Sequence, residues 1–447
     1  MDEDIAEVLR GSIGHFWEQE GNLAPDDHKA LSGFVRLNSD DVVELKVLDE
    51  EELAPSVLEH PAVSPGTWIV GVTEAGGVVI PTISGLGHRR NWGGSKASFR
   101  QYRAHALLTK VNVRQLRGVL LLEASAYFDD GLSWAGLSAI AEADEFDAQG
   151  RWRKVTYTLT SREGDTAAGS AGSIRIDLAE YWKVNDNDSS KTLKTALEVK
   201  ASASRPRQLS ELIDCLLAVQ DLLGLAFDRF TPASGARAVP MGYPLDGGDR
   251  PHLWHRGLMV VPPSAAAASE PVDARPLFWL DDLGGPPAIG RWIRASRRFP
   301  TAISSLTQMH RGGASTIAGR LQQVAAAIEY YVNMCRLDRN AQWAQHVRSK
   351  AHAELLAGRV GGPFVQLVGD THVWAGRLVD AYNGLKHDPR YQPDATELRL
   401  LAWSADVLLM CALLDRVAGS KAPSRRVLSD YRIEQGGEEV RSSLGTS

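Results

Sequence analysis

The front of the chain, up to about residue 200, alternates short apolar runs with Gly, Asp, Asn and Pro. The period-2 pattern of Val43, Leu45 and Val47 is typical of a strand with one buried face. Many such runs between turn residues predict an antiparallel sandwich or barrel. The strands that we expect span residues 33–37, 42–48, 67–72, 78–83, 104–111, 119–126, 155–159 and 173–178.

One helix is expected to interrupt this β region at about residues 207–225. Leu209, Leu212 and Leu216 lie on one face of it at helical spacing. Pro- and Gly-rich sequence follows, in which we predict one strand at 258–261 and a loop at 262–271.

From about residue 286 the apolar period becomes that of helices, most clearly at Leu321, Val324 and Ile328. Several helices with short connections predict a bundle. The polar, Gly- and Ser-containing residues 421–447 predict a flexible tail. The helices that we expect span 288–299, 316–337, 341–357, 365–387 and 395–417.

The predicted fold class is therefore α+β and multidomain. An antiparallel β-sandwich-like domain at 1–275 precedes an all-α helical bundle at 276–420 and the tail. A length of 447 residues agrees with two or three domains.

Charge divides the chain in the same place. The net charge of −6 argues against nucleic-acid binding by the whole surface. Residues 1–290, however, hold 28 Lys and Arg against 41 Asp and Glu, whereas residues 291–420 hold 16 against 10. The basic back half is thus free to bind phosphate, and the acidic half is expected to cover it at rest.

The N-terminus lacks the basic start and apolar run of a signal peptide, and no segment approaches the roughly 18 apolar residues of a membrane helix. Cys215, Cys335 and Cys411 are far apart in apolar surroundings, which predicts buried, unpaired thiols. We therefore expect a cytoplasmic protein that has no membrane contact, metal or cofactor.

The segment 377–387, RLVDAYNGLKH, holds the most informative polar residues. Asn383 and His387 are four residues apart, so they share one helix face. His can transfer protons near neutral pH, and Asn can hydrogen-bond a phosphate or the imidazole. Gly384 between them allows close approach of a ligand or backbone. Taken alone, such a pair is more typical of a capped last helical turn that packs against a neighbour.

Asn-x-x-x-His at the end of a bundle helix resembles the signature of HEPN domains, usually Arg-polar-x(3)-His. The front half is similar to the ApeA N-terminal domain, and the order of several short motifs supports this resemblance. These motifs are Gly14-His-Phe-Trp17, Leu31-Ser-Gly-Phe-Val35, Val43-Glu-Leu45, Ile83-Ser-Gly-Leu-Gly87, Tyr127-Phe-Asp and Leu-Ser-Trp134.

The resemblance implies an anti-phage defence protein, in which the front domain senses a phage-derived trigger and a HEPN bundle cleaves RNA without a metal. HEPN domains form homodimers, so that two motifs line one cleft. In such a cleft His387 would transfer protons, and Asn383 would orient it or the phosphate. The ribose 2′-hydroxyl would attack the adjacent phosphate.

The chain departs from the HEPN pattern at one position, because the expected Arg is Tyr382. Arg377 or Arg390 are the candidate replacements. Loss of a charged phosphate ligand can cost about 10²–10³ in rate. Two alternatives therefore stay open: a catalytically weakened HEPN domain that binds RNA or a partner, and a β domain that binds carbohydrate or protein while the bundle dimerises.

Other basic residues are candidates for RNA binding, although a solvated helix face explains them equally well. The loop 88–94 is a candidate for ligand recognition. Glu329, in an apolar stretch, needs a partner such as Arg320 or His387. The RNA-binding candidates are Lys386, Arg294, Arg297, Arg298 and Arg311.

Overall fold

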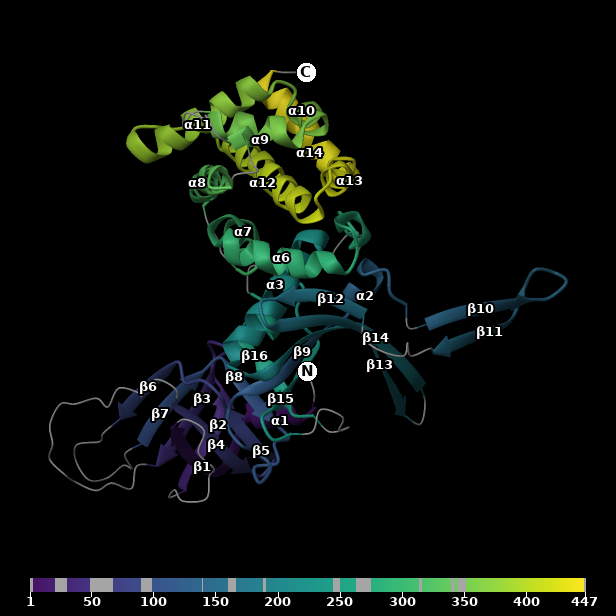
Figure 1. Cartoon of the computed structure of the whole chain (residues 1–447), viewed down its shortest axis with the longest axis vertical. Helices are drawn as coiled ribbons and strands as arrows, with labels where there is room; N and C mark the ends of the chain where they lie inside the picture. The colour runs from purple at the N-terminus through teal and green to yellow at the C-terminus, as the bar shows by residue number, and fades with distance from the viewer. Residues whose placement is uncertain are drawn as a thin grey trace.

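The computed structural model shows a β-rich front half followed by helices (Figure 1). It describes residues 3–20, 30–48, 67–89, 99–138, 140–159, 166–187, 190–243, 250–262, 275–312, 316–338, 342–344 and 351–445.

Within these residues, fourteen strands form one sheet, and every strand pair in it is antiparallel. The strands follow the order β12-β13-β14-β9-β15-β16-β8-β5-β4-β1-β2-β3-β7-β6. Their bounds are β1 Ser12–Glu20, β2 Leu31–Leu37, β3 Val43–Leu48, β4 Thr67–Thr73, β5 Gly76–Ile80, β6 Gly85–Arg89, β7 Phe99–Ala104, β8 Ala106–Thr109, β9 Leu121–Phe128, β12 Thr166–Ala171, β13 Ile174–Asn187, β14 Ser190–Arg207, β15 Gly235–Pro240 and β16 His252–His255.

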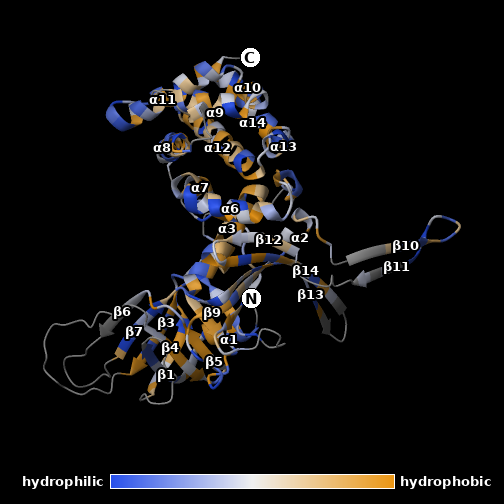
Figure 2. Cartoon of the chain, viewed as in Figure 1, coloured by the Kyte–Doolittle hydropathy of each residue, from blue (hydrophilic) through white to orange (hydrophobic). Residues whose placement is uncertain are grey.

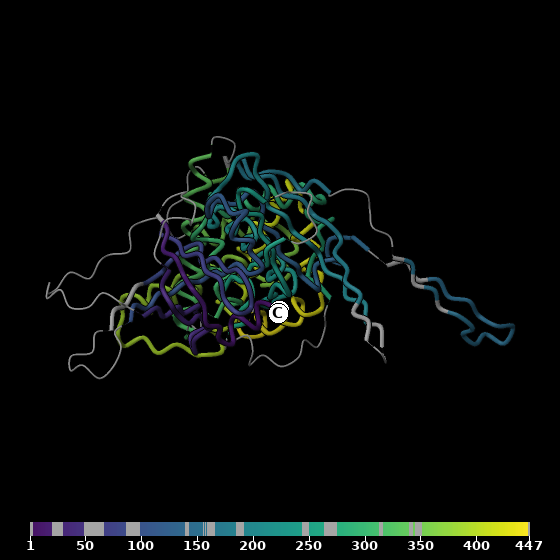
Figure 3. Tube along the Cα trace, turned by 90° about the horizontal axis from the view of Figure 1, so that it is seen from below, coloured from purple at the N-terminus to yellow at the C-terminus, as the bar shows by residue number. Residues whose placement is uncertain are grey.

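Two further strands, β10 (Ile140–Phe146) and β11 (Trp152–Leu159), pair only with each other in a separate ribbon. This ribbon projects from the body of the molecule in both views of the chain (Figures 1 and 3).

Helix α3 (Leu209–Phe227) covers the sheet beside β14 and β9. It begins with a capping box, in which Gln208 and Glu211 bond each other's backbone, and it ends at Asp228 in the left-handed conformation. Its long apolar stripe is buried, because both the sheet and the helices of the back half pack against it.

The remaining helices belong to the N-terminus, to short connections and to the back half of the chain. Their bounds are α1 Glu3–Arg10, α2 Gly131–Trp134, α4 Arg256–Met259, η2 Asp281–Leu283, α6 Pro287–Arg298, α7 Pro300–Thr307, α8 Ile317–Arg336, η3 Gln342–Ala344, α9 His352–Val360, α10 Gly362–Val368, α11 Thr371–His387, α12 Ala395–Ala418, α13 Ala422–Leu428 and α14 Tyr431–Leu444.

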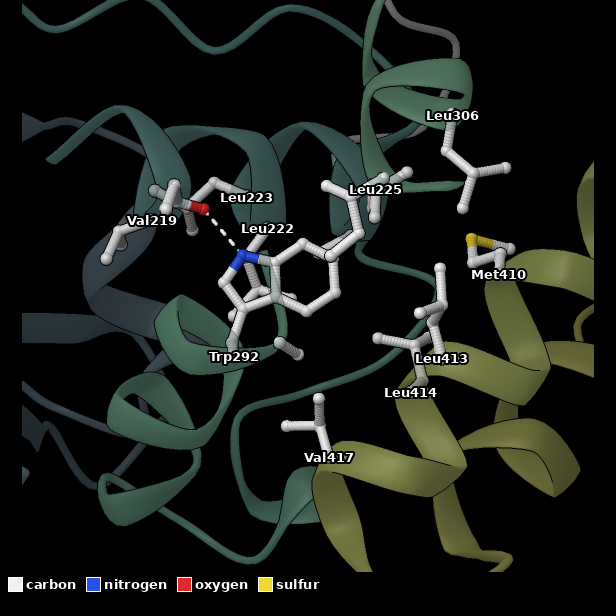
Figure 4. Close-up of a cluster of buried hydrophobic side chains, with 14 of the residues drawn as sticks. Val219, Leu222, Leu223, Leu225, Trp292, Leu306, Met410, Leu413, Leu414 and Val417 are labelled. Atoms are coloured by element: carbon white, nitrogen blue, oxygen red, sulfur yellow. Dashed lines mark hydrogen bonds between the residues drawn. The ribbon is translucent and has the colours of Figure 1, made fainter. Parts of the chain in front are cut away.

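One apolar core joins the sheet to the helices of the back half. A second, smaller core lies between α1 and the strands β1–β5, β7, β8 and β16. Trp292 of α6 lies at the junction, where its indole nitrogen donates to the Ala218 carbonyl at 2.7 Å (Figure 4). Val219 and Leu222 of α3 surround one side, and Leu414 and Val417 of α12 face the other (Figure 4). Helix α6 therefore joins the two halves, since its Trp292 contacts α3 on one side and α12 on the other.

The predicted fold class is confirmed, with a large antiparallel sheet in the front half and helices in the back half. The helices expected at 207–225, 288–299, 316–337 and 395–417 are present within two residues at each end. Hydrophobic positions concentrate along α12 and the inner strands, whereas the corner from α11 into α12 is hydrophilic (Figure 2).

Several predictions of individual elements were wrong. No strand forms at 258–261, because residues 258–259 are the end of α4 (Arg256–Met259) and residues 260–261 are in neither a helix nor a strand. The helix expected at 365–387 is broken at Gly369, which adopts a positive φ of 78°. The helix expected at 341–357 is instead η3 and α9, and residues 345–350 lie outside the described ones.

The flexible tail was also wrong, since residues 422–444 form α13 and α14. Ile433, Gly437 and Val440 are buried at helical spacing. Gly436 and Gly437 allow α14 to approach its neighbours closely, because a Cβ at either position would meet the Trp403 ring or Leu367 at about 2.5 Å. Glycines that suggested flexibility are in fact packing positions.

Candidate functional site

Helix α11 carries the Asn-His pair, and its local sequence determines both of its ends. The Asp370 carboxylate accepts from the His372 and Val373 amides at 2.8 and 3.1 Å and so caps the start. Trp374 and Leu378 lie on its buried face. After His387 the helix stops, because Pro389 lacks the amide hydrogen that would continue it.

Asn383 and His387 point away from that buried face. At 100° per residue both lie roughly opposite Trp374 and Leu378 on the helix. His387 is exposed and Asn383 is half-buried. The two side chains therefore form a surface pair at a helix end, available to a ligand or to a second copy of the chain.

Gly384 serves a different purpose from the one that its sequence suggested. The ring of Tyr391 packs on it, so that a Cβ at position 384 would lie 2.7 Å from that ring. Burial, together with the charges of Glu397 and Asp380, raises the pKa of Tyr391. The ring of Tyr391, which the sequence analysis did not single out, occupies the space beside Gly384 that was expected to admit a ligand or backbone.

The two candidate replacements for the motif Arg differ in their surroundings. The Arg377 guanidinium pairs with the Glu397 carboxylate of α12 at 3.4 Å. Arg390 is exposed, and its backbone amide donates to the Asp388 carboxylate at 2.9 Å. Among the described residues, the Arg390 side chain makes no ion pair or hydrogen bond, so it is the more available cation.

Lys386 is exposed at the same helix end. Its ammonium group lies 3.5 Å from the Tyr382 hydroxyl and 5.3 Å from the centre of that ring. Tyr382, which stands where the motif has Arg, thus holds the Lys386 ammonium beside it through a cation–π contact.

The arginines of α6 lie elsewhere and are bound within the chain. Arg294 donates to the Ser170 carbonyl at 2.5 Å, and Arg297 donates to the Ala171 carbonyl at 3.2 Å. Arg298 pairs with Asp338. These three arginines of α6, which were predicted to bind RNA, therefore bond to β12 and to Asp338 just after α8.

Arg311 was a candidate for RNA binding, but its side chain makes several contacts at the junction between the two halves. Its guanidinium binds the Asp221 carboxylate at 2.6 Å, the Gly257 and Leu217 carbonyls at 2.9 and 3.2 Å, and the Gln220 amide oxygen at 3.0 Å. These contacts use the guanidinium N–H groups of Arg311 that would otherwise donate to RNA phosphates.

The partners proposed for Glu329 were wrong. Arg320 pairs with Asp406, whose pKa burial raises to about 7 against the opposing charge of that Arg. Glu329 is half-buried and acts electrostatically on His352, whose pKa burial lowers. Neither residue contributes to the α11 pair.

The three cysteines are buried and form no disulfide, as predicted, and burial raises the pKa of Cys215 to about 11.

The loop at 88–94 begins in β6, but residues 90–94 lie outside the described ones. No helix in the described part of the chain is both long and apolar enough to cross a membrane.

Comparison with known proteins gives one match. No curated protein and no solved structure matches the chain. The family described as ApeA N-terminal domain 1 matches residues 11–292, from β1 into α6. This span covers more than half of the chain and reaches the helix that cements the two halves, so the protein belongs to the ApeA N-terminal domain 1 family.

Proposed function

We propose that this ApeA protein acts in anti-phage defence by cleaving RNA with its helical half, which would be a HEPN domain. The supporting observation is the placement of Asn383 and His387 on the exposed last turn of α11, with the unpaired Arg390 just beyond it. A phage-derived trigger would act through the β-rich domain.

The chemistry requires a base, an acid and a phosphate ligand. One His387 would remove the proton of a ribose 2′-hydroxyl, whose oxygen attacks the adjacent phosphorus. The bond to the 5′-oxygen of the next nucleotide breaks, and that oxygen receives a proton from the second histidine. Asn383 and Arg390 would stabilise charge on the phosphate. No metal is needed, and the products would be a 2′,3′-cyclic phosphate and a 5′-hydroxyl.

A homodimer would supply the second histidine. The motif lies at the surface of a helix end rather than in a closed pocket, so one copy offers half of a cleft. We expect two α11 ends to face each other across the dimer axis.

The test is RNA cleavage by the full chain in EDTA, comparing wild type, His387→Ala and His372→Ala. His372 is the matched control, because it is an exposed histidine at the opposite end of the same helix. We expect cleavage to fall by at least about 10²-fold in His387→Ala and to stay unchanged in His372→Ala. Equal activity of His387→Ala and wild type would reject the proposed role.

The ion pair between Arg377 and Glu397 favours a second candidate, a catalytically weakened HEPN domain that binds RNA or a partner. In that case RNA binding would depend on Lys386 and Arg390 although no cleavage occurs. Gel-shift titration of the same proteins distinguishes this candidate from the nuclease.

A further inference from the structure

A cavity of about 420 Å³ lies at the end of α12 that is remote from His387. Its size falls within the range of small-molecule sites, roughly 300–1,000 Å³. Four segments of the helical half contribute to its wall. The lining residues are Tyr331, Trp343, Leu356, Arg359, Ala412, Asp415, Arg416, Gly419, Ser420 and Lys421.

The single carboxylate in this lining already has its partners. Asp415 binds the Lys421 ammonium at 2.8 Å and accepts from the Ser424 amide at 3.2 Å. Lys421 also donates to the backbone carbonyl of Arg359. These contacts hold the wall in shape and engage the Asp415 carboxylate with Lys421 and Ser424 rather than with Arg359 or Arg416.

Arg416 is oriented by its neighbours. It shares the Asp338 carboxylate with Arg298, and its guanidinium lies 4.8 Å from the centre of the Phe299 ring. One carboxylate facing two guanidinium groups leaves a positive charge beside the cavity.

Arg359 adds a second positive charge. Its side chain lines the cavity, is exposed, and makes no ion pair or hydrogen bond among the described residues. The local total is four cations, Arg298, Arg359, Arg416 and Lys421, against the carboxylates of Asp338 and Asp415. The carbonyl end of α12 contributes roughly half a negative charge, which this excess outweighs.

Aromatic surface completes the lining. Trp343 is half-buried and faces the same cavity as Arg359. Tyr331 is buried, donates its hydroxyl to the Ala412 carbonyl at 3.4 Å, and stays neutral because burial raises its pKa. An indole beside cations suits a ligand with a planar ring and a phosphate, since bases stack favourably on aromatic side chains.

The cavity is distinct from the α11 pair. Glu397, which contacts α11, and Ala412, which lines the cavity, are fifteen residues apart on α12. At 1.5 Å per residue the separation is roughly 20 Å. A ligand here would contact α8, α9 and α12 at once, near Phe299 at the end of α6.

We propose that this cavity is a binding site for a free nucleotide, with Arg359 on the phosphate, the positive charge of Arg416 beside it, and Trp343 against the base. The proposal does not depend on RNA cleavage, because it rests on different residues and is tested by binding alone.

The experiment is calorimetric titration of the full chain with adenosine monophosphate, inorganic phosphate and a 5′-phosphorylated tetraribonucleotide. The variants are Arg359→Ala, Trp343→Leu and the control Arg399→Ala. Arg399 is an exposed arginine near the opposite end of α12, where it pairs with Glu439. Thermal unfolding of each variant verifies that it is folded.

We expect saturable binding of adenosine monophosphate that is about tenfold weaker in Arg359→Ala and unchanged in Arg399→Ala. Trp343→Leu should reduce its affinity to that of inorganic phosphate. The proposal is overturned by any of four results: no saturable binding of the mononucleotide, equal affinity for phosphate and nucleotide in wild type, an unaffected Arg359→Ala protein, or binding of the tetranucleotide alone.

Discussion

Two basic regions of the helical half differ in what the fold does with their charge. Around α6 and Arg311, the guanidinium groups bind carbonyls and carboxylates of the front domain. At the end of α11, Lys386 and Arg390 remain exposed beside His387. The difference shows that a cluster of arginines is a binding surface only where the fold leaves its donors unsatisfied.

This comparison also sharpens the meaning of the charge division along the chain. The acidic half does meet the basic half, since Asp221 of α3 binds Arg311 and the β12 carbonyls bind Arg294 and Arg297. The contact lies beside an apolar core that the two halves share.

The largest expected effect on stability is at Arg311. Arg311→Met keeps the aliphatic stem but leaves the Asp221 carboxylate without its cation, which should cost about 3–5 kcal/mol in the free energy of unfolding. Lys386→Met is the matched control and should change stability by less than about 0.5 kcal/mol. Urea denaturation of both variants measures these changes. Similar unfolding midpoints for Arg311→Met and Lys386→Met would contradict the difference between the two basic regions.

A smaller effect is expected from His310, whose pKa burial and the charges of Arg320 and Arg311 lower to about 4. Between pH 6.5 and 4 the unfolded state then binds a proton that the folded state does not. The contribution of His310 to folding stability should therefore fall as the pH drops through this window, by up to roughly 3 kcal/mol.

His310→Gln removes that contribution and should flatten the pH dependence of the unfolding free energy relative to wild type. Parallel curves for wild type and His310→Gln would show that His310 does not titrate in this way.

The smallest effects are expected at Arg377. Its ion pair is exposed, so Arg377→Ala should change stability by less than about 0.5 kcal/mol. Because Glu397 engages it, we expect RNA cleavage to fall less than about threefold in this variant, and by about 10²-fold in Arg390→Ala. Single-turnover cleavage rates of the two variants test this expectation. A larger loss of cleavage in Arg377→Ala than in Arg390→Ala would make Arg377 the replacement for the motif Arg.

Local sequence patterns predicted many of the helices and strands. The periodicity around Val324 and Ile328 placed α8, and the alternation of Val43, Leu45 and Val47 placed β3. Strand β14 was missed, because the Lys, Thr and Ser of its first half resemble a loop until they pair with β13. For α14, the polar sequence concealed a helix whose glycines fit against Trp403 and Leu367.

The sequence by itself determined the order of β-rich and helical halves, the ApeA resemblance and the shared face of Asn383 and His387. Helical and strand periods are local properties, and a four-residue spacing needs no tertiary contact. Only the tertiary structure decided which cations are free. Arg311 and Arg390 are both basic residues in apparent loops, yet one is surrounded by acceptors and the other by solvent. That distinction arises from elements brought together across the chain, which no local pattern records.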